Sequence, residues 1–197
     1  MSAEPLDETA LARLFLAART HNAWQDRPVA EDTLHRLYEL ASMGPTSFNG
    51  SPMRVVFVRS AEGKDRLCEA LLPSNVAKTM QAPVCAIVAE DISFWEAFTT
   101  LSPHKDVRGY FRDNAALTEE TAFRNSSMQG AYLIMAARAL GLDCGPMSGF
   151  DRSRVDALFF EGTSWRSNFL CNLGYGDASA LYPRNPRLAF ETACRFA

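Results

Sequence analysis

The spacing of apolar residues along the chain predicts helices that alternate irregularly with short strands. Apolar positions three or four residues apart predict four helices, over residues 5–19, 31–43, 61–72 and 119–140. Short runs of β-branched and other apolar residues predict three strands, over residues 54–59, 83–89 and 168–174. Gly44-Pro45 and Gly141 end two of the helices.

Two segments lack a clear period. Residues 91–116 mix aromatic and charged side chains with Pro103, which predicts helical pieces and a mobile flap. Residues 181–188 contain two prolines, which block both a helix and a sheet ladder, so this segment is expected to be a loop. Because the elements show no regular strand–helix–strand rhythm, we expect an α+β fold, with residues 1–197 as one domain, rather than a doubly wound sheet.

Composition and charge narrow the class of protein. Hydrophobic residues make up 47% of the 197, and charged residues 22%, which is typical of a folded globular domain. Twenty Lys and Arg against 23 Asp and Glu give a formal net charge of −3, which argues against a nucleic-acid-binding protein. No apolar run reaches the roughly 18 residues that a membrane span requires, so no membrane association is predicted.

The cysteines and the N-terminus favour a cytoplasmic location. Five widely separated cysteines with no C-x-x-C pair fit reduced thiols packed as small apolar groups. The N-terminal residues 1–15 have acidic side chains ahead of the apolar stretch and no basic region, so they do not resemble a signal peptide.

Several common catalytic motifs are absent. There is no G-x-G-x-x-G after a strand and no phosphate-binding P-loop motif. His21, His35 and His104 lie far apart, with no pair at metal-ligand spacing, so no metal site is predicted. His21 alone stands in a polar cluster.

Four polar clusters are candidates for binding. In Arg19-Thr20-His21-Asn22 the guanidinium and hydroxyl suit a phosphate, although Arg19 could equally favour the C-terminus of the preceding helix. The loop from Gly44 to Pro52 contains Thr46, Ser47 and Asn49. This loop fits either a plain turn or a set of hydrogen bonds to the edge of a heteroaromatic ring.

The other two clusters lie in the second half of the chain. In residues 145–149, Gly-Pro-Met-Ser-Gly, Gly149 allows a flat ligand to approach the backbone, while Asp151 just beyond could simply cap a helix. Arg184 and Arg187 stand three apart in a proline-rich loop. They fit a phosphate clamp or an ordinary solvated loop.

Together these segments resemble the nitroreductase family of flavoproteins, from Arg19 to Arg187. The resemblance is strongest to its malonic-semialdehyde reductase branch, from bacterial uracil utilisation. The runs that carry it are ARTHN (18–22), GPTS (44–47), ETAFRNSSMQ (120–129), ALGLD (139–143), GPMSGFD (145–151) and GYGD (174–177). The resemblance implies a nitroreductase-like fold with a central, mostly antiparallel sheet flanked by helices, and FMN bound between the subunits of an intertwined homodimer.

The resemblance also assigns residues to the cofactor. It implies that the first FMN segment is Arg19, Thr20 and His21, that Asn75 lies near the pyrimidine edge, and that Arg184 and Arg187 hold the phosphate. The loop beside the flavin would be Pro45, Thr46, Ser47 and Asn49, supplied by the partner subunit. The segment over the central ring would be Pro146, Met147, Ser148 and Gly149, with the N–H of Ser148 facing flavin N5 as the catalytic group.

Two positions depart from the family pattern. Relatives often carry Lys or Arg where Asn22 stands, to support the charge of the reduced flavin, so Arg19 or His21 would have to do so here. Many relatives carry an acidic residue where Ser148 stands. The backbone donor at that position is retained.

The implied activity is an oxidoreductase that takes hydride from NADPH or NADH and reduces a small aldehyde, malonic semialdehyde, to 3-hydroxypropionate by a ping-pong reaction. Asn125 and Ser148 are candidates to donate to the substrate oxygen, and Arg108, Arg112 and Arg124 to bind its carboxylate. Alternatives are a broad nitroaromatic or quinone reductase, a non-catalytic FMN-binding protein, and a thiol enzyme that uses Cys144.

Overall fold

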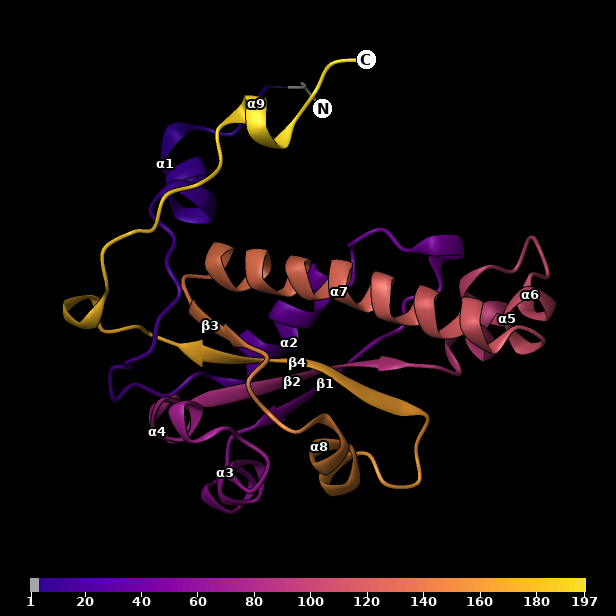
Figure 1. The fold of residues 1–197 in the computed structure, drawn as a ribbon, viewed down its shortest axis with the longest axis horizontal. Coiled ribbons are helices and arrows are strands. Elements are labelled where there is room, and N and C mark those ends of the chain that lie inside the picture. The colour runs from indigo at the N-terminus through magenta and orange to yellow at the C-terminus, as the bar shows by residue number, and fades with distance from the viewer. Residues whose placement is uncertain (1–3) are drawn as a thin grey trace.

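A four-stranded antiparallel sheet forms the centre of the computed structural model, which describes residues 4–197 (Figure 1). The strands are β1 (Met53–Val58), β2 (Val84–Asp91), β3 (Asp143–Met147) and β4 (Trp165–Gly174), in the order β1-β2-β4-β3. All three strand pairings are antiparallel. The α+β class and the antiparallel sheet predicted from the sequence are therefore confirmed.

Helices cover both faces of this sheet (Figure 1). The longer helices are α2 (Glu31–Ala41), α3 (Ala61–Cys68), α4 (Pro73–Gln81), α7 (Ala115–Ala139) and α8 (Arg152–Phe159). The short helical segments are α1 (Glu8–Leu11), η1 (Ala12–Leu16), η2 (Ser47–Asn49), η3 (Phe94–Ala97), α5 (Phe98–Leu101), α6 (Arg108–Arg112), η4 (Ala178–Ala180) and α9 (Phe190–Ala193). Figure 1 shows α2 and α7 on one face, and α3, α4 and α8 on the other.

The sheet has one hydrophobic core on each face, and the alternation of side chains in β2 explains why. Val84, Ala86 and Val88 pack toward α2 and α7, while Cys85 and Ile87 pack toward α3 and α8. Every residue of β2 is buried, because successive side chains of a central strand point to opposite, covered faces. The continuous apolar run in the sequence reflects this burial.

Four of the predicted elements differ from the structure by three residues or more at one end. The helix expected over residues 61–72 ends at Cys68, and α4 follows it as a separate helix that begins with Pro73. The helix expected over 5–19 is confined to α1 and η1. Helix α7 begins at Ala115, where the side chain of Asn114 caps it, and β4 begins at Trp165.

The irregular segment 91–116 forms short helices around an aromatic cluster. Phe94, Phe98 and Phe111 are buried against one another, with ring centroids 5.0 to 5.8 Å apart. Phe48, from the loop before β1, lies against Phe98 and Phe111. The expected helical pieces are confirmed, and the mobility of the segment stays a prediction.

Two arms of the chain lie together, away from the sheet (Figure 1). The N-terminal arm, α1 with η1, buries no side chain. The C-terminal arm is residues 181–197. Its first part, residues 181–189, has no regular secondary structure, as the prolines predicted. Large apolar side chains are exposed on both arms, among them Phe15, Leu16, Leu188 and Phe196. No helix within residues 4–197 is both long enough and apolar enough to cross a membrane.

Candidate functional site

Four arginines line one cleft of about 240 Å³, between the two arms and the end of α7. They are Arg19, Arg138, Arg184 and Arg187. The remaining lining residues are Ala18, Thr20, Asn22, Tyr182, Pro183 and Asn185, with no carboxylate among them. The structure thus brings together Arg19, Thr20, Arg184 and Arg187, which the sequence analysis drew from two separate clusters. This set of donors suits an anion such as a phosphate.

Backbone carbonyls hold several of these guanidinium groups in place. Arg184 Nη2 donates to the carbonyls of Leu16 and Ala18, at 2.7 and 2.8 Å. In the opposite direction, Arg19 donates to the carbonyl of Tyr182. The two arms are therefore joined to each other through the residues of the arginine cleft.

The outer edge of β3 begins beside the arginine cleft. Thr20 forms a parallel bridge with Cys144, and the N–H of His21 donates to the carbonyl of Cys144 at 3.0 Å. Backbone groups alternate in direction along a strand, so Pro146 also faces this outer side. Ser148 follows directly after the last residue of β3, and its carbonyl accepts from the N–H of Phe150 at 3.0 Å. Proline has no N–H to leave unpaired. Among the described residues, the N–H of Ser148 has no acceptor and its side chain is exposed.

Helix α4 supports the chain where it leaves β3. Asn75 is buried, and its Nδ2 donates to the carbonyl of Gly149 at 2.7 Å. The N–H of Leu72 donates to the same carbonyl at 3.0 Å. A Cβ at Gly149 would lie 2.5 Å from Asn75 Nδ2, so glycine is required for this close approach. Asn75 and Gly149 thus lie together, as the sequence analysis expected of two residues at one site.

The histidine of the first cluster points into the protein. His21 is 6% exposed, and its Nε2 lies 3.4 Å from Asp143 Oδ1. Its imidazole also faces Gly176, whose N–H donates to Asp143 Oδ2. Unlike Arg19 and Thr20, His21 does not line the arginine cleft.

A lysine from α4 lies beside Asn22. Lys78 Nζ donates to Asn22 Oδ1 at 3.3 Å. Asn22 is the position at which the sequence lacks the cation that relatives often carry. Helix α4 therefore places a positive charge near that position, a juxtaposition that sequence reasoning missed because α4 itself was not predicted.

The loop from Gly44 to Pro52 lies on another part of the molecule. Ser47 N–H donates to Asn125 Oδ1 at 2.8 Å, and Asn49 Nδ2 donates to the carbonyl of Leu101. Phe48, Asn49 and Ser51 all have positive φ angles, from 42° to 58°, so tertiary contacts must maintain this conformation. Pro45, Ser47 and Asn49 are exposed, and Thr46 is half-buried.

The distance along α7 separates this loop from the arginine cleft. Asn125 holds the loop, whereas Arg138 lines the cleft thirteen residues further along the helix. At 1.5 Å per residue, Asn125 and Arg138 are about 20 Å apart along the helix, whereas Gly44, at the start of the loop, lies against Tyr132. Within one chain, Pro45, Thr46, Ser47 and Asn49 do not line the arginine cleft.

Both amide atoms of Asn125 already hold backbone groups of the protein, which leaves one N–H of its side chain for a further bond. Its Oδ1 accepts from Ser47, and its Nδ2 donates to the carbonyl of Thr121 at 2.8 Å. The three arginines proposed for a substrate carboxylate each pair with an acidic side chain: Arg108 with Asp106, Arg112 with Asp113 and Arg124 with Glu120.

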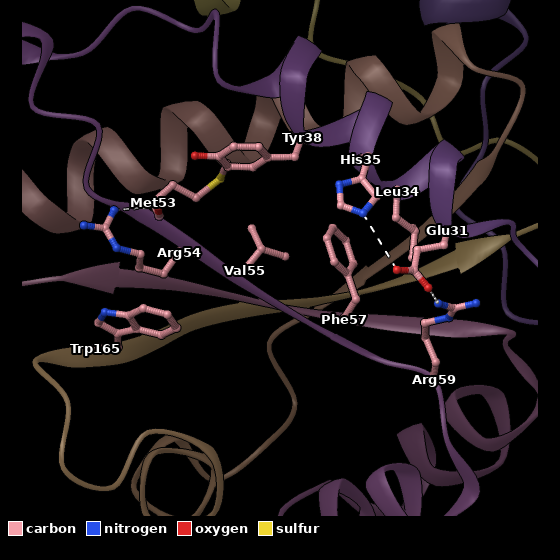
Figure 2. Close-up of a pocket in the computed structure, with 10 residues that line it drawn as sticks. All are labelled: Glu31, Leu34, His35, Tyr38, Met53, Arg54, Val55, Phe57, Arg59 and Trp165. Carbon is pink, nitrogen blue, oxygen red and sulfur yellow. Dashed lines mark hydrogen bonds and ion pairs between the residues drawn. The ribbon is translucent and has the colours of Figure 1, made fainter. Parts of the chain in front are cut away.

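A groove of about 550 Å³ lies between α2 and the edge strand β1 (Figure 2). Val55 and Phe57 of β1 point into it, and Glu31 at one end pairs with both Arg59 and His35. It lies along an unpaired sheet edge and contains a mixture of charges, so it offers no concentrated site for an anion. A strand edge of this kind suits an added segment of polypeptide.

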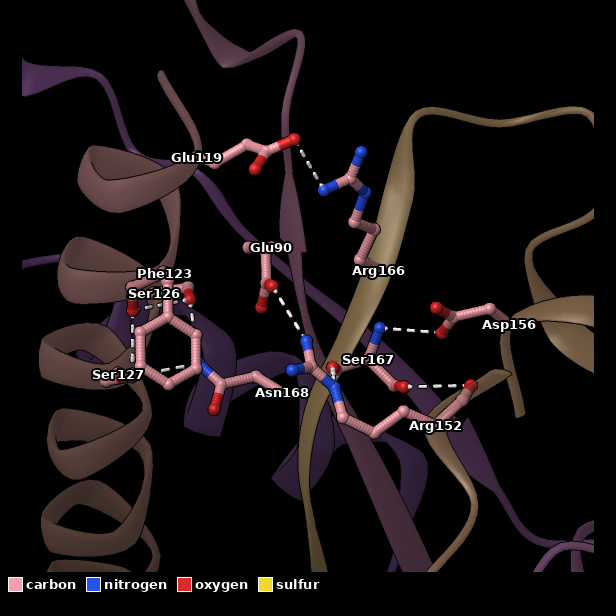
Figure 3. A network of polar contacts seen from close by, with 10 residues as sticks. All are labelled: Glu90, Glu119, Phe123, Ser126, Ser127, Arg152, Asp156, Arg166, Ser167 and Asn168. Atoms are coloured by element: carbon pink, nitrogen blue, oxygen red, sulfur yellow. Dashed lines mark hydrogen bonds and ion pairs between the residues drawn. The ribbon is translucent and has the colours of Figure 1, made fainter. Parts of the chain in front are cut away.

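A polar network fixes the start of α8, just after Gly149 (Figure 3). Arg152 donates to the carbonyl of Ser167 at 2.6 Å and to Glu90 Oε1 at 3.0 Å. Asp156 accepts from the N–H of Ser167 at 2.7 Å. Strand β3 ends at Met147, opposite Leu170, and does not reach Ser167 of β4. The side chains of Arg152 and Asp156 bond the backbone of Ser167 instead.

We expect Glu90 to make the fold less stable as the pH rises. Burial raises the pKa of Glu90 to about 7 from an ordinary value of 4.5, despite the opposing effect of Arg152. Between these values the folded chain retains a proton that the unfolded chain has lost, so the contribution of Glu90 to stability is fully present below pH 4.5 and is lost as the pH rises past 7. Thermal unfolding of wild type and Glu90→Gln at pH 5 and pH 8 should show a smaller pH difference for the variant.

Glu119→Gln is the matched control, because Glu119 is exposed and pairs with Arg166 at 2.9 Å. It should follow the wild-type pH dependence. An equal pH dependence in wild type and Glu90→Gln would contradict the assignment to Glu90.

Three of the five thiols are buried, whereas Cys68 is half-buried and Cys194 is exposed, so the expected packing is wrong for Cys194. Cys144 and Cys171 are buried in the core beneath α2 and α7. Burial raises the pKa of Cys85 to about 12, which keeps that thiol protonated. The buried Cys144 contacts the carbonyl of Ile134, a position without the solvent access that the thiol-enzyme alternative requires. Within residues 4–197 no cluster of three potential metal ligands occurs.

Comparisons with known proteins identify the family. The sequence profile of the Nitroreductase family matches residues 16–175. A Burkholderia lata protein, provisionally named NADH dehydrogenase/NAD(P)H nitroreductase, is 61% identical over 190 residues, covering 96% of this chain and 97% of its own length. The chain belongs to the nitroreductase family.

Solved structures share the fold. A Bacillus subtilis protein described provisionally as a nitroreductase has a TM-score of 0.87 at 18% identity, covering 97% of this chain and all of its own. An Exiguobacterium sibiricum protein of the same provisional description, solved in complex with FMN, has a TM-score of 0.81 at 18% identity, over the full length of both chains. The nitroreductase-like fold expected from the resemblance is confirmed.

Proposed function

We propose that the chain is an FMN-dependent NAD(P)H oxidoreductase. The observation that carries the proposal is the arginine cleft, which lies at the start of the outer edge of β3, while the unpaired N–H of Ser148 lies at the far end. The phosphate would be held by Arg19, Thr20, Arg184 and Arg187. The absence of any carboxylate from the cleft lining fits a dianionic group.

The residues beyond the cleft fit the ring system. Pro146 and Met147 lead to Ser148, whose N–H is free to donate to N5, and Gly149 keeps the backbone open to a flat ligand. Asn75 stabilises this segment through Gly149, and Lys78 would supply the positive charge at the pyrimidine edge. His21 supports Arg19 and Thr20 through its backbone bond to β3.

We further propose that the protein is an intertwined homodimer. Exposed apolar side chains lie on the outer face of α7, at Phe123, Met128 and Tyr132, and on the two arms. A second copy would cover this surface, and its C-terminal arm could occupy the groove of Figure 2. The partner's loop 45–49 would then complete a site that the same loop of the first chain does not line.

FMN would supply the hydride chemistry, accepting from NADH or NADPH and donating to an acceptor. The protein has to bind, orient and exclude water, so it needs no side-chain nucleophile. Ser148 would stabilise negative charge at the reacting edge through its backbone N–H, and Lys78 would do so at the opposite edge. A non-catalytic FMN-binding protein would use the same donor at Ser148, so reduction by a nicotinamide separates the two alternatives.

The substrate we propose is malonic semialdehyde, reduced to 3-hydroxypropionate in pyrimidine degradation in the cytoplasm. Its support is the set of sequence runs that resemble the malonic-semialdehyde reductase branch. A second candidate is a nitroaromatic or quinone reductase, favoured by the provisional name of the 61% identical relative.

A spectroscopic test separates these proposals. The purified protein should be yellow, and anaerobic NADH or NADPH should bleach it. Malonic semialdehyde should then restore the colour faster than a nitroaromatic compound such as nitrobenzoate, as measured by stopped-flow absorbance.

Each outcome has a distinct meaning. A bleached protein that only the nitroaromatic compound reoxidises would overturn the aldehyde substrate and retain the flavoenzyme. A yellow protein that neither nicotinamide bleaches would contradict an oxidoreductase. A colourless protein that fails to bind added FMN would overturn the proposal that FMN is the cofactor.

A further inference from the structure

Arg138 lies on the last turn of α7 and lines the arginine cleft, although no sequence cluster pointed to it. Its Nη1 donates to the carbonyl of Leu14 at 2.9 Å. Its Nε is buried and has no acceptor among the described residues. Native proteins rarely leave a charged, buried donor without a partner, so the bond to Leu14 alone does not satisfy this guanidinium group.

Arg138 differs from the other three arginines in its attachment. Arg19 follows the N-terminal arm, and Arg184 and Arg187 belong to the exposed C-terminal arm. Arg138 instead extends from a helix whose adjacent residues Ala136 and Ala137 are buried in the core. Of the four arginines, Arg138 is therefore the one that is attached to the packed core of the molecule.

The charges of the cleft require a counter-ion. Within residues 4–197, none of the four guanidinium groups forms an ion pair, and all four surround one small cleft. Backbone carbonyls of Leu14, Leu16, Ala18 and Tyr182 accept some of their hydrogen bonds but carry no net charge. An anion in the cleft would offset the mutual repulsion and accept the remaining bonds.

We propose that Arg138 is a further phosphate-binding residue, in which Nη2, which makes no hydrogen bond among the described residues, donates to a phosphoryl oxygen while Nη1 keeps its bond to Leu14. The inference rests on the proposed function, since it assigns the phosphate of FMN to the arginine cleft. Through Arg138 the bound phosphate is connected to the core, and through Arg19 and Arg184 to both arms. The competing explanation is that Arg138 only fastens the N-terminal arm to α7.

Binding of FMN and of riboflavin distinguishes the two roles, because riboflavin lacks the phosphate. Dissociation constants for both are measured by flavin fluorescence on the apoprotein of wild type and Arg138→Met. The variant should bind FMN about tenfold to a hundredfold more weakly, the range for loss of one charge-assisted contact. Its affinity for riboflavin should remain within about threefold of wild type, since that ligand makes no phosphate contact.

Two further variants guard against a trivial loss of folding. Arg138→Lys retains a cation that can reach Leu14 but loses the planar fork, so it should fold normally and still bind FMN more weakly than wild type. Arg36→Met removes an exposed arginine that pairs with Glu39, and should bind both ligands as wild type does.

Two results would overturn the assignment of Arg138: an unchanged affinity for FMN, or an equal loss for FMN and riboflavin, which would indicate the purely structural role. Wild type that binds neither flavin would instead overturn the proposed function itself. The two failures are therefore distinguishable.

Discussion

Replacing both Arg184 and Arg187 by alanine should lower the affinity for FMN about a hundredfold. Each charge-assisted contact to a phosphate contributes about 1.5–3 kcal/mol, or about tenfold to a hundredfold in affinity. The two residues are close together, so their effects need not multiply fully. The measurement is FMN retention through desalting, followed by titration of the apoprotein, with riboflavin as the ligand that lacks the phosphate.

The same double variant also tests how the arms are held. Arg184 bonds to the carbonyls of Leu16 and Ala18, so its loss should release residues 8–18 and increase their amide hydrogen exchange. Arg195→Ala, which removes an arginine of the same arm outside the cleft, is the control and should bind FMN normally. If the double variant retains FMN as tightly as wild type, the phosphate assignment is wrong.

The predictable part of the fold is the part with one dominant physical signal. Strand β2 is buried on both faces, so its sequence is a continuous apolar run, and α7 combines helical spacing with a glycine stop at Gly141. The proline-rich segment 181–189 was recognisable because proline cannot join a helix or ladder.

Strand β3 was missed for an equally physical reason. Its sequence, DCGPM, contains glycine and proline, both of which are rare in strands. It is an edge strand, where a proline at an outward-facing position costs no ladder hydrogen bond. The residue after this strand is Ser148, whose N–H is free. The glycine and proline that made the strand hard to predict therefore stand next to the proposed flavin contact.

The residues of the candidate site likewise divide into those that the sequence indicates and those that only the structure reveals. Arg19, Thr20, Arg184 and Arg187 stand in clusters that the sequence displays, and the resemblance joined them. Lys78 and Arg138 are single cations on helices, and helical lysines and arginines are usually solvated. Only the tertiary packing of α4 beside Asn22, and of α7 beneath Leu14, brings them to the site.

Gly176→Ala should be the most disruptive small substitution in the support of this site. A Cβ at position 176 would lie 1.9 Å from Nδ1 of His21, well inside any possible contact, and His21 is itself enclosed. The imidazole or the backbone must move, at a cost of about 2–3 kcal/mol. For a chain of this length we expect the midpoint of thermal unfolding to fall by about 4–12 °C.

Gly176→Ala should also weaken FMN binding, because the displaced His21 connects directly to the arginine cleft. The N–H of His21 donates to Cys144, which fixes Thr20 and Arg19 beside β3, so FMN affinity should also fall. Gly109→Ala is the matched control, since a Cβ there meets nothing closer than 3.9 Å and alanine favours a helix. The double variant His21→Ala/Gly176→Ala removes the overlap and should be less destabilised than the sum of its single variants. Strictly additive losses would show that the steric conflict with His21 is not the cause.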